Sequence, residues 1–313
     1  MTSQTTPKAL KKTSSEPTLI IITGPTAVGK TELSVEIARR LGTGIASADA
    51  RQFYREMQIG TAPPPPELLS AVPHFFIGHL SIFDYYNVSM FEQQALEVLD
   101  RLFATSGFAV ATGGSGLYLD TLCQGIGDLP DADPAIRAYV REVFAEKGLE
   151  GLRGWVKSID PEYYEVVDLA NPNRLMRAVE VYLSTGMPFS AMRNHQPVRR
   201  PFRIRRIVLD RDRSELFRRI NERVDLMVRQ GLIEEAVGLF PHRDLNALNT
   251  VGYKELFAWL SNRMNLHDSV EKIKTNSRRY AKRQLTWFRR YSGAEWFHPD
   301  NPDAIMNYLL SAI

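Results

Sequence analysis

The chain has 313 residues, enough for about two domains of ordinary size. Hydrophobic residues make up 44% of it and charged residues 24%, a balance typical of globular proteins and not of disordered or collagen-like chains. The one cysteine, Cys123, excludes an internal disulfide and a cysteine-cluster metal site, and it favours a reducing compartment such as the cytoplasm. No apolar run reaches about 18 residues, so the sequence predicts no membrane span.

Charge is divided unevenly along the chain. Residues 1–170 carry 14 Lys and Arg against 21 Asp and Glu, whereas residues 171–313 carry 25 against 15. Most of the basic residues are arginines, whose planar guanidinium suits phosphate groups and base edges. We expect the second half to bind a polyanion, although a solvated surface of mixed charge would give the same counts.

The first part of the chain alternates between strand and helix patterns. Residues 1–17 are rich in Ser, Thr and Lys and are interpreted as a disordered tail. Within residues 18–127, short apolar strands are predicted over 19–22, 45–48 and 108–111, and helices over 30–41 and 90–103. Such alternation predicts an α/β fold in which helices cover both faces of a parallel sheet.

The alternation of strand and helix patterns ends after Asp128. Residues 128–200 show helical patterns without a strand, which predicts a helical insert, and Pro197–Pro201 is the expected hinge. Residues 201–313 are expected to complete the core, with one strand over 205–209 and basic helices from Ser214 to the end.

One motif carries a specific chemistry. The run Gly24, Pro25, Thr26, Ala27, Val28, Gly29, Lys30, Thr31 matches G-x-x-x-x-G-K-[ST], with a predicted strand before it and a helix after it. Backbone N–H groups of such a loop and the helix N-terminus cradle a di- or triphosphate. Lys30 would reach the terminal phosphate, and Thr31 would hold Mg²⁺.

The acidic residues that could act with this loop do not decide which reaction it serves. An ATPase or kinase would normally add an acid at the end of an apolar strand, but the strand 108–111 ends in Thr112. Asp210 ends a later strand and is the candidate for that role, or else a surface acid paired with Arg211 or Arg213. Asp49 follows the strand 45–48 at its carboxyl end, beside the phosphate loop, where a carboxylate can act as a general base, touch the metal, or merely cap a turn.

Seven blocks in this order resemble one family, the tRNA dimethylallyltransferases. They are GPTAVGKT at 24–31, SADARQFY at 47–54, MQIGTA at 57–62, GGSGLY at 113–118, NRLMRA at 173–178, TVGY at 250–253 and AKRQLTW at 281–287. The resemblance extends over residues 19–297 and departs from the family pattern at Ala50, Pro63 and Asn249.

The resemblance implies a P-loop fold and a prenyl transfer to tRNA. The N6 amine of the adenosine immediately 3′ of the anticodon, in tRNAs that read codons starting with U, would attack the allylic carbon of dimethylallyl diphosphate. Pyrophosphate would leave, with Mg²⁺ as the cofactor. The P-loop would then hold a diphosphate leaving group instead of ATP, which explains the absence of an acid at Thr112. The enzyme is expected to be a cytoplasmic monomer.

The resemblance also implies roles for individual residues. Asp49 would be the base, Thr26 and Arg223 would surround the diphosphate, and Ser115 and Arg137 would position the substrate. The implied tRNA contacts are Asp49, Ala50, Arg51, Gln52, Asn173, Arg174, Leu175, Met176, Arg177, Asn249, Thr250, Val251, Gly252, Tyr253, Lys254, Lys282 and Arg283.

A basic helix supports an RNA partner independently of the family. No acidic residue interrupts residues 272–291, and at 100° per residue Arg279, Arg283 and Arg290 fall within about 40° of one another. Trp287 and Phe288 lie on the opposite side, so one face is expected to pack and the other to meet phosphates or solvent. An adenylate prenyltransferase, a kinase and a nucleic-acid-binding ATPase remain as alternatives, of which the first would need no basic surface.

Overall fold

A computed structural model describes residues 16–127, 130, 131, 133–193 and 197–311. Of the predicted tail, residues 1–15 lie outside the described part, whereas Glu16 and Pro17 are ordered against β5. The Arg203 N–H donates to the Pro17 carbonyl at 2.8 Å, and its side chain pairs with Glu16 at 3.1 Å. Within the described residues, no helix has the length and apolar character needed to cross a membrane.

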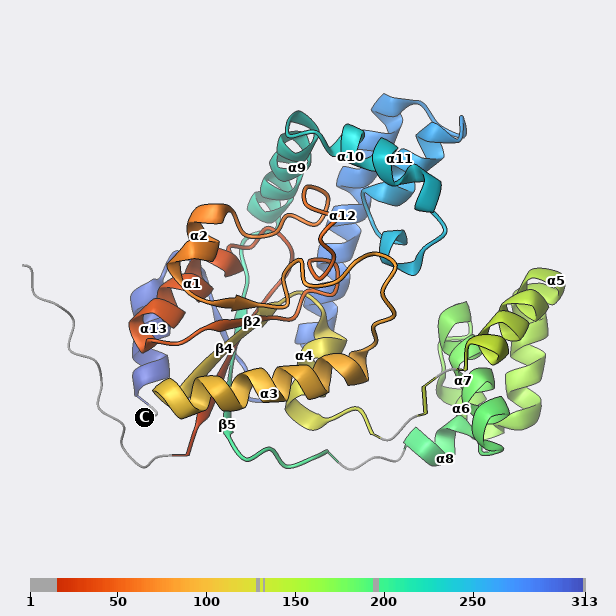
Figure 1. The fold of residues 1–313 in the computed structure, drawn as a ribbon, viewed down its shortest axis with the longest axis horizontal. Coiled ribbons are helices and arrows are strands. Elements are labelled where there is room, and N and C mark those ends of the chain that lie inside the picture. The colour runs from red at the N-terminus through yellow and green to blue at the C-terminus, as the bar shows by residue number, and fades with distance from the viewer. Residues whose placement is uncertain (1–15, 128–129, 132, 194–196, 312–313) are drawn as a thin grey trace, which may run out of the picture. The chain divides into compact units, whose positions relative to one another are not determined.

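The first compact unit, residues 1–123 and 200–313, is built around a parallel sheet. In the described chain its strands are β1 (Thr18–Thr23), β2 (Ile45–Ser47), β3 (His74–Phe75), β4 (Phe108–Gly113), β5 (Arg203–Leu209) and β6 (Glu295–Phe297). They lie in the order β3-β2-β4-β1-β5-β6, and every pairing is parallel (Figure 1). The predicted fold class is therefore confirmed.

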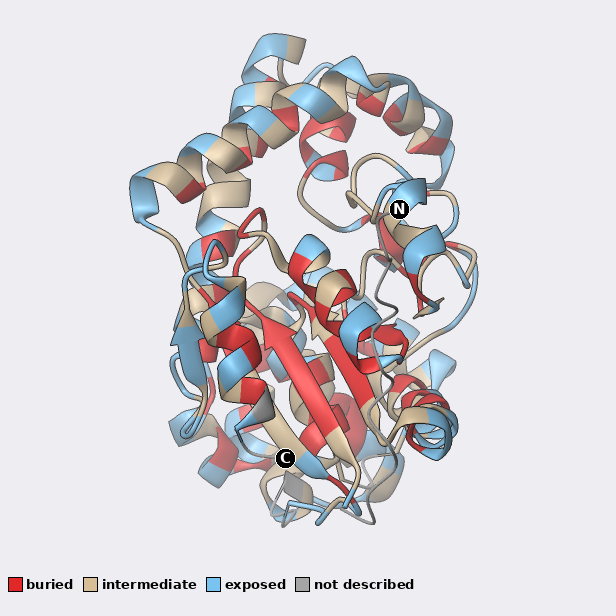
Figure 2. Cartoon of the chain, turned by 90° about the vertical axis from the view of Figure 1, so that its left-hand side faces the viewer, coloured by how far each residue is buried: buried red, intermediate tan, exposed pale blue. Residues whose placement is uncertain are grey.

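Both faces of the sheet are buried because the side chains of each strand alternate. On β1, Leu19 and Ile21 pack with α3 (Val88–Ser106) and α4 (Gly116–Gln124). Ile20 and Ile22 face the other way and pack with α1 (Lys30–Leu41) and α13 (Pro302–Leu310). The inner strands β1, β2 and β4 are consequently buried over most of their length, and Figure 2 shows strand segments of this kind in red.

The remaining helices of this unit follow β5, apart from α2 (Pro66–Ala71). They are α9 (Arg213–Arg229), α10 (Leu232–Leu239), the short 3₁₀ turns Phe240–His242 and Asn246–Leu248, α11 (Tyr253–Leu260) and α12 (Leu266–Phe288). The prediction that only helices follow Ser214 is wrong, because β6 adds an edge strand. It was missed because it is three residues long and half exposed, so it has no apolar run.

The second compact unit comprises residues 124–199, against a predicted insert of 128–200. Its helices in the described residues are α5 (Pro134–Ile159), α6 (Pro161–Val166), α7 (Pro172–Thr185) and α8 (Phe189–Arg193). Gly148 breaks α5 with a φ of 62°, so the element consists of two helical segments. Val140, Leu152 and Val179 are fully buried between α5 and α7, so the unit has a core of its own.

Candidate active site

The loop of residues 24–29 joins the end of β1 to Lys30, the first residue of α1. Gly24 and Gly29 have φ angles of 149° and 109°, and Ala27 has one of 65°. A Cβ on Gly24 would lie 2.5 Å from the carbonyl oxygen of Leu209 on β5, so a larger residue has no room there. This irregular backbone gathers peptide groups at the start of a helix, which is the geometry of an anion site.

Basic side chains engage the carbonyl oxygens of the loop. Lys30 Nζ donates to the carbonyls of the first two loop residues at 3.0 and 2.9 Å. Arg219 Nε donates to Ala27 O at 2.9 Å, and Arg211 Nε donates to Val28 O at 2.8 Å. Because these oxygens would otherwise repel an anion, their engagement by cations favours binding of negative charge.

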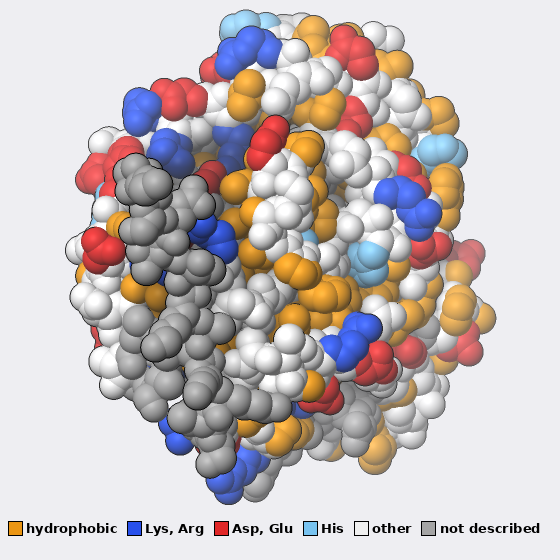
Figure 3. All heavy atoms as spheres, turned by 60° about the vertical axis from the view of Figure 1, so that its left-hand side comes forward, with side chains coloured by type: hydrophobic (Ala, Val, Ile, Leu, Met, Phe, Trp, Pro, Cys, Tyr) orange, Lys and Arg blue, Asp and Glu red, His pale blue; other side chains and the backbone are white. Residues whose placement is uncertain are grey.

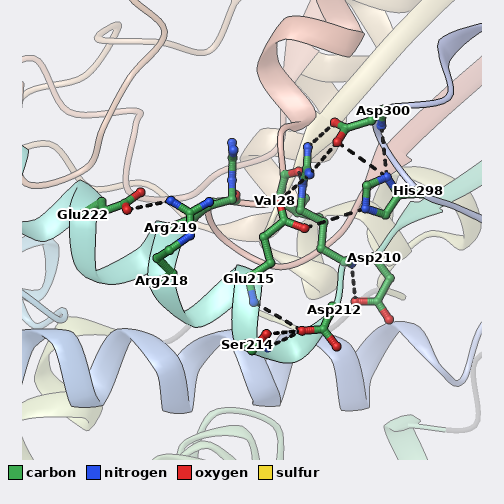
Figure 4. Close-up of polar contacts among 12 residues, drawn as sticks. Val28, Asp210, Asp212, Ser214, Glu215, Arg218, Arg219, Glu222, His298 and Asp300 are labelled. Carbon is green, nitrogen blue, oxygen red and sulfur yellow. Dashed lines mark hydrogen bonds and ion pairs between the residues drawn. The ribbon is translucent and has the colours of Figure 1, made fainter.

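Arg211 is in turn held by a network of acidic residues (Figure 4). Its guanidinium contacts Glu215 at 2.6 Å and Asp300 at 2.9 Å, and His298 lies 3.9 and 3.8 Å from the same two carboxylates. The hydrogen bonds between Arg211 and Asp300 raise the pKa of the arginine and lower that of the acid. The network fixes the arginine that supports Val28.

Two cavities adjoin the loop. The smaller, of about 80 Å³, contains Lys30, Thr31 and Glu32 from the start of α1 among its lining. The larger, of about 430 Å³, extends toward residues 249–254 and Arg283. Both are lined by Thr26, Asp49, Thr61, Ala62, Arg223 and Tyr280. The two cavities therefore meet at these shared residues.

Asp49 lies at this junction because it follows β2 directly, at the carboxyl edge of the sheet. Its Oδ1 accepts a hydrogen bond from the Arg51 N–H at 3.1 Å, and the Ser115 hydroxyl accepts one from the Ala50 N–H at 3.0 Å. The next two residues anchor the loop: Arg51 Nη1 donates to the carbonyl of Ala247 at 2.9 Å, and Gln52 Nε2 donates to that of Ala62 at 2.9 Å. The carboxylate is thus fixed where both cavities can deliver a ligand to it.

The electrostatics of the smaller cavity favour an anion. Burial lowers the pKa of Lys30 to about 8, with Asp49 opposing and Arg223 adding to that effect. Burial also lowers the pKa of Arg223, whose Nη1 lies 3.4 Å from the Thr26 hydroxyl. A ligand carrying several negative charges would stabilise the charged forms of these two partly desolvated side chains.

Thr31 lines the smaller cavity, together with the carboxylates of Glu32 and Asp49. The described residues contain no group of three or more His, Cys, Asp or Glu side chains able to cage a metal ion. A hydroxyl and isolated carboxylates fit Mg²⁺, which takes few protein ligands and completes its shell with phosphate oxygens and water.

The acid expected of an ATPase is absent from the corresponding position. Thr112, the second-to-last residue of β4, lines the smaller cavity, and its hydroxyl donates to the Ile22 carbonyl at 3.0 Å. Asp210 lines neither cavity, and its carboxylate accepts from the Arg211 N–H at 2.9 Å. Asp210 is thus placed as a residue that orders the β5–α9 turn.

Sequence reasoning missed two residues of α12 that the structure brings to the site. Tyr280 lines both cavities, and burial followed by the nearby Asp49 charge raises its pKa. Gln284 is 5% exposed and contacts the phosphate loop directly. Its position among the inward residues Ala281 and Phe288 is a signal that could have found it, since a polar residue on an apolar face needs partners.

Most of the predicted tRNA contacts of the first unit line the larger cavity or are exposed, but one is buried in the hydrophobic core. Ala50, Arg51, Asn249, Thr250, Val251, Gly252, Lys254 and Arg283 line the larger cavity, and Lys282 is exposed on α12. Tyr253 was predicted with them, but its side chain is fully buried, and its hydroxyl donates to Glu235 at 2.7 Å. Tyr253 is therefore a core residue, because a phenol beneath Gly60 completes the packing there.

The basic face of α12 is shorter than predicted. Arg279 and Arg283 are exposed on the helix, but α12 ends at Phe288, so Arg290 does not share their face. Arg290 instead lies over the Trp287 ring at 3.9 Å and within 4.0 Å of Asp120. On the face that Figure 3 shows, the basic side chains of the described residues are interspersed with acidic ones.

In the second unit, α7 presents Asn173, Arg174, Met176 and Arg177 at least partly to solvent. Leu175, which was predicted to contact tRNA, is fully buried in the core of this unit, because it faces α5. The nearly buried carboxylate of Glu180 pairs with Arg137 at 3.3 Å and Arg177 at 3.6 Å. One buried acid therefore holds two of the arginines that the sequence singles out.

Comparison with known proteins assigns the chain to a group. A family model described as IPP transferase matches residues 52–291. tRNA dimethylallyltransferase 1 of Bacteroides fragilis is 47% identical over 296 residues, which are 95% of this chain and 98% of the relative. tRNA dimethylallyltransferase 2 of Parabacteroides distasonis is 48% identical over 295 residues, covering 94% of this chain and 99% of the relative.

Solved structures agree with these relatives. The full-length tRNA isopentenylpyrophosphate transferase of Bacillus halodurans has a TM-score of 0.69 and 33% identity, and the match covers 95% of this chain and 96% of that one. A eukaryotic dimethylallyltransferase captured acting on tRNA has a TM-score of 0.73 and 25% identity, covering 87% and 70%. The matches extend over both compact units.

Proposed function

Because the chain belongs to the IPP transferase family, the tRNA dimethylallyltransferases, we propose that it transfers a dimethylallyl group from dimethylallyl diphosphate to tRNA. The acceptor is N6 of the adenosine immediately 3′ of the anticodon, in tRNAs that read codons starting with U. One observation carries the proposal: Asp49 lies where a small cavity lined by Lys30 and Arg223 meets a larger one. A diphosphate donor and a nucleotide acceptor can then reach the same carboxylate from opposite sides.

The smaller cavity suits the leaving group. As the allylic C–O bond breaks, negative charge develops on pyrophosphate, where Lys30 and Arg223 can stabilise it. Thr26, beside Arg223, is placed to donate a hydrogen bond to a phosphate oxygen. Mg²⁺, held by Thr31 together with phosphate oxygens and water, would neutralise part of the same charge.

Asp49 accounts for the proton. The N6 amine forms a bond to the allylic carbon while the C–O bond breaks, and the surplus proton on nitrogen passes to the Asp49 carboxylate. Its fixed position favours this transfer, because Oδ1 is held by the Arg51 N–H. No water or hydroxyl has to be activated, which fits Thr112 in place of an acid.

The larger cavity suits the acceptor. It is lined partly by apolar side chains, including Ile220, Val224 and Met227, and its rim carries Lys254 and Arg283. We assign this rim, the exposed residues of α7 and the basic face of α12 to tRNA. Since a single chain lines both cavities, we propose that the enzyme works as a monomer, and a tRNA substrate supports a cytoplasmic location.

The nearest alternative is prenylation of free adenylate by the same site. Labelled dimethylallyl diphosphate, offered with unmodified tRNA, with AMP or with ATP, separates the two. We expect label only in tRNA, released as N6-dimethylallyladenosine after digestion. Label in AMP with none in tRNA would overturn the assignment of the acceptor.

A further inference from the structure

Gln284 joins two loops that flank the reacting groups. Its Oε1 accepts a hydrogen bond from the Thr26 N–H at 2.8 Å, and its Nε2 donates to the Gly114 carbonyl at 2.9 Å. The side chain is 5% exposed, so both hydrogen bonds are shielded from water. Thr26 belongs to the phosphate loop, whereas Gly114 follows β4.

The second loop leads directly to the base. Ser115, the residue after Gly114, accepts the hydrogen bond from the Ala50 N–H, and Ala50 follows Asp49. A chain of contacts therefore runs from the phosphate loop through Gln284 and the Gly114–Ser115 segment to the base. Gln284 is the link between the half of the site that holds the leaving group and the half that removes the proton.

We infer that Gln284 is a positioning residue for the transfer reaction, which sets the phosphate loop at the correct distance from Asp49. This inference rests on the proposed function of the site. Gln284 acts through Thr26, whose amide it orients and whose hydroxyl contacts Arg223. Because α12 also carries Arg279 and Arg283 on its exposed face, one helix connects the RNA-facing surface to the diphosphate site.

The side chain of Gln284 packs where a side chain at Gly114 would lie. A Cβ on Gly114 would lie 2.2 Å from Gln284 Nε2 and 3.5 Å from its Cδ, with Asp49 Oδ2 at 3.9 Å. The backbone of Gly114 is not in the left-handed region, so glycine is required here for room and not for conformation. The pair is thus matched: the glycine is needed because the glutamine is present.

The first test replaces Gln284 by Met, which keeps its length and removes both hydrogen bonds. We expect the dissociation constant of pyrophosphate and the KM of the donor to rise roughly 10-fold, and the single-turnover rate at saturating donor to fall roughly 10-fold. The dissociation constant of tRNA should stay within about twofold. Gln284→Glu retains the acceptor for Thr26 but turns an oxygen toward the Gly114 carbonyl and adds negative charge beside the phosphate loop, so it should lower both donor affinity and rate.

Gln93→Glu, at an exposed site on α3, is the matched control for the added charge. Unchanged or tighter pyrophosphate binding by Gln284→Met would overturn the inference, since Gln284 would then merely occupy the place of a phosphate. Loss of tRNA affinity in parallel with donor affinity would also overturn it, because it would indicate general unfolding. A wild-type enzyme that binds pyrophosphate but does not prenylate tRNA would instead refute the proposed function.

The second test uses the matched glycine and does not depend on how well Gln284→Met folds. Gly114→Ala alone should reduce the single-turnover rate roughly 10-fold, because its Cβ displaces the glutamine. Gly114→Ala combined with Gln284→Ala should be no slower than Gln284→Ala alone. Equal costs of Gly114→Ala in both backgrounds would contradict the coupling.

Discussion

At the residue scale, Lys30 makes donor binding depend on pH. Its pKa is lowered to about 8, chiefly by burial, so the ammonium is charged at pH 7 and becomes neutral as the pH rises above 8. A bound diphosphate stabilises the charged form and raises this pKa again. Binding above pH 8 must therefore take up a proton and become weaker as the pH rises.

We expect pyrophosphate affinity to fall between pH 7 and pH 9. Calorimetry at pH 8.5 in two buffers of different ionisation enthalpy should reveal proton uptake. Lys30→Met should bind more weakly at every pH and lose the uptake. Binding by the wild type that neither weakens with pH nor takes up a proton would show that Lys30 is not the titrating contact.

The residues at the site also show where prediction from sequence succeeds and fails. The motif predicts the phosphate loop because local glycine and helix-start requirements fix it, and Asp49 follows from its place after a strand. Gln284 stands out as a polar residue on the apolar face of α12, but which loops Gln284 and Tyr280 reach depends on how that helix packs, which no local pattern encodes. Tyr253 and Leu175 were assigned to RNA through resemblance, but tertiary packing buries both.

At the scale of elements, α12 carries the test of RNA binding. Arg279 and Arg283 are exposed on one face, while Ile273, Ala281 and Phe288 are buried. Replacing both arginines by glutamine should weaken tRNA binding and reduce its salt slope by up to about 0.7–0.9 log unit per lost phosphate contact. Donor affinity should not change, because neither side chain contacts the phosphate loop.

Salt-titrated binding of an anticodon stem-loop measures this slope. The double replacement Arg39→Gln/Arg40→Gln is a matched control, since it removes the same charge from the last turn of α1, far along the helix from Lys30. If the control and the α12 variant leave the salt slope equally unchanged, the RNA surface lies elsewhere, for which α7 is the next candidate.

The elements themselves were largely predictable where their pattern is local. Helix α1 spans 30–41 as predicted, because Gly29 and Gly42 bound an amphipathic run. Strands β3 and β6 are two and three residues long at the edges of the sheet, so their only signal is pairing with a neighbour. Arg290 was misplaced because the end of α12 is not marked by glycine or proline.

At the scale of the whole molecule, the fold is that of a P-loop protein but the site is not that of an ATPase. Thr112 occupies the strand end where an acid would be needed, and Asp210 lies outside both cavities. We therefore expect no tRNA-stimulated ATP hydrolysis, as measured by phosphate release at saturating tRNA. A stimulated rate that disappears on Asp210→Asn would identify an ATPase instead.

The two cavities meet at Asp49, the proposed catalytic base. Asp49→Asn keeps the size of the side chain and its acceptor for the Arg51 N–H but removes the basic carboxylate. Single-turnover prenylation and tRNA affinity should be measured together, with Asp100→Asn, an exposed position on α3, as the control. We predict a rate loss of roughly 10²- to 10⁴-fold with tRNA binding intact. Near-normal turnover by Asp49→Asn would contradict the account.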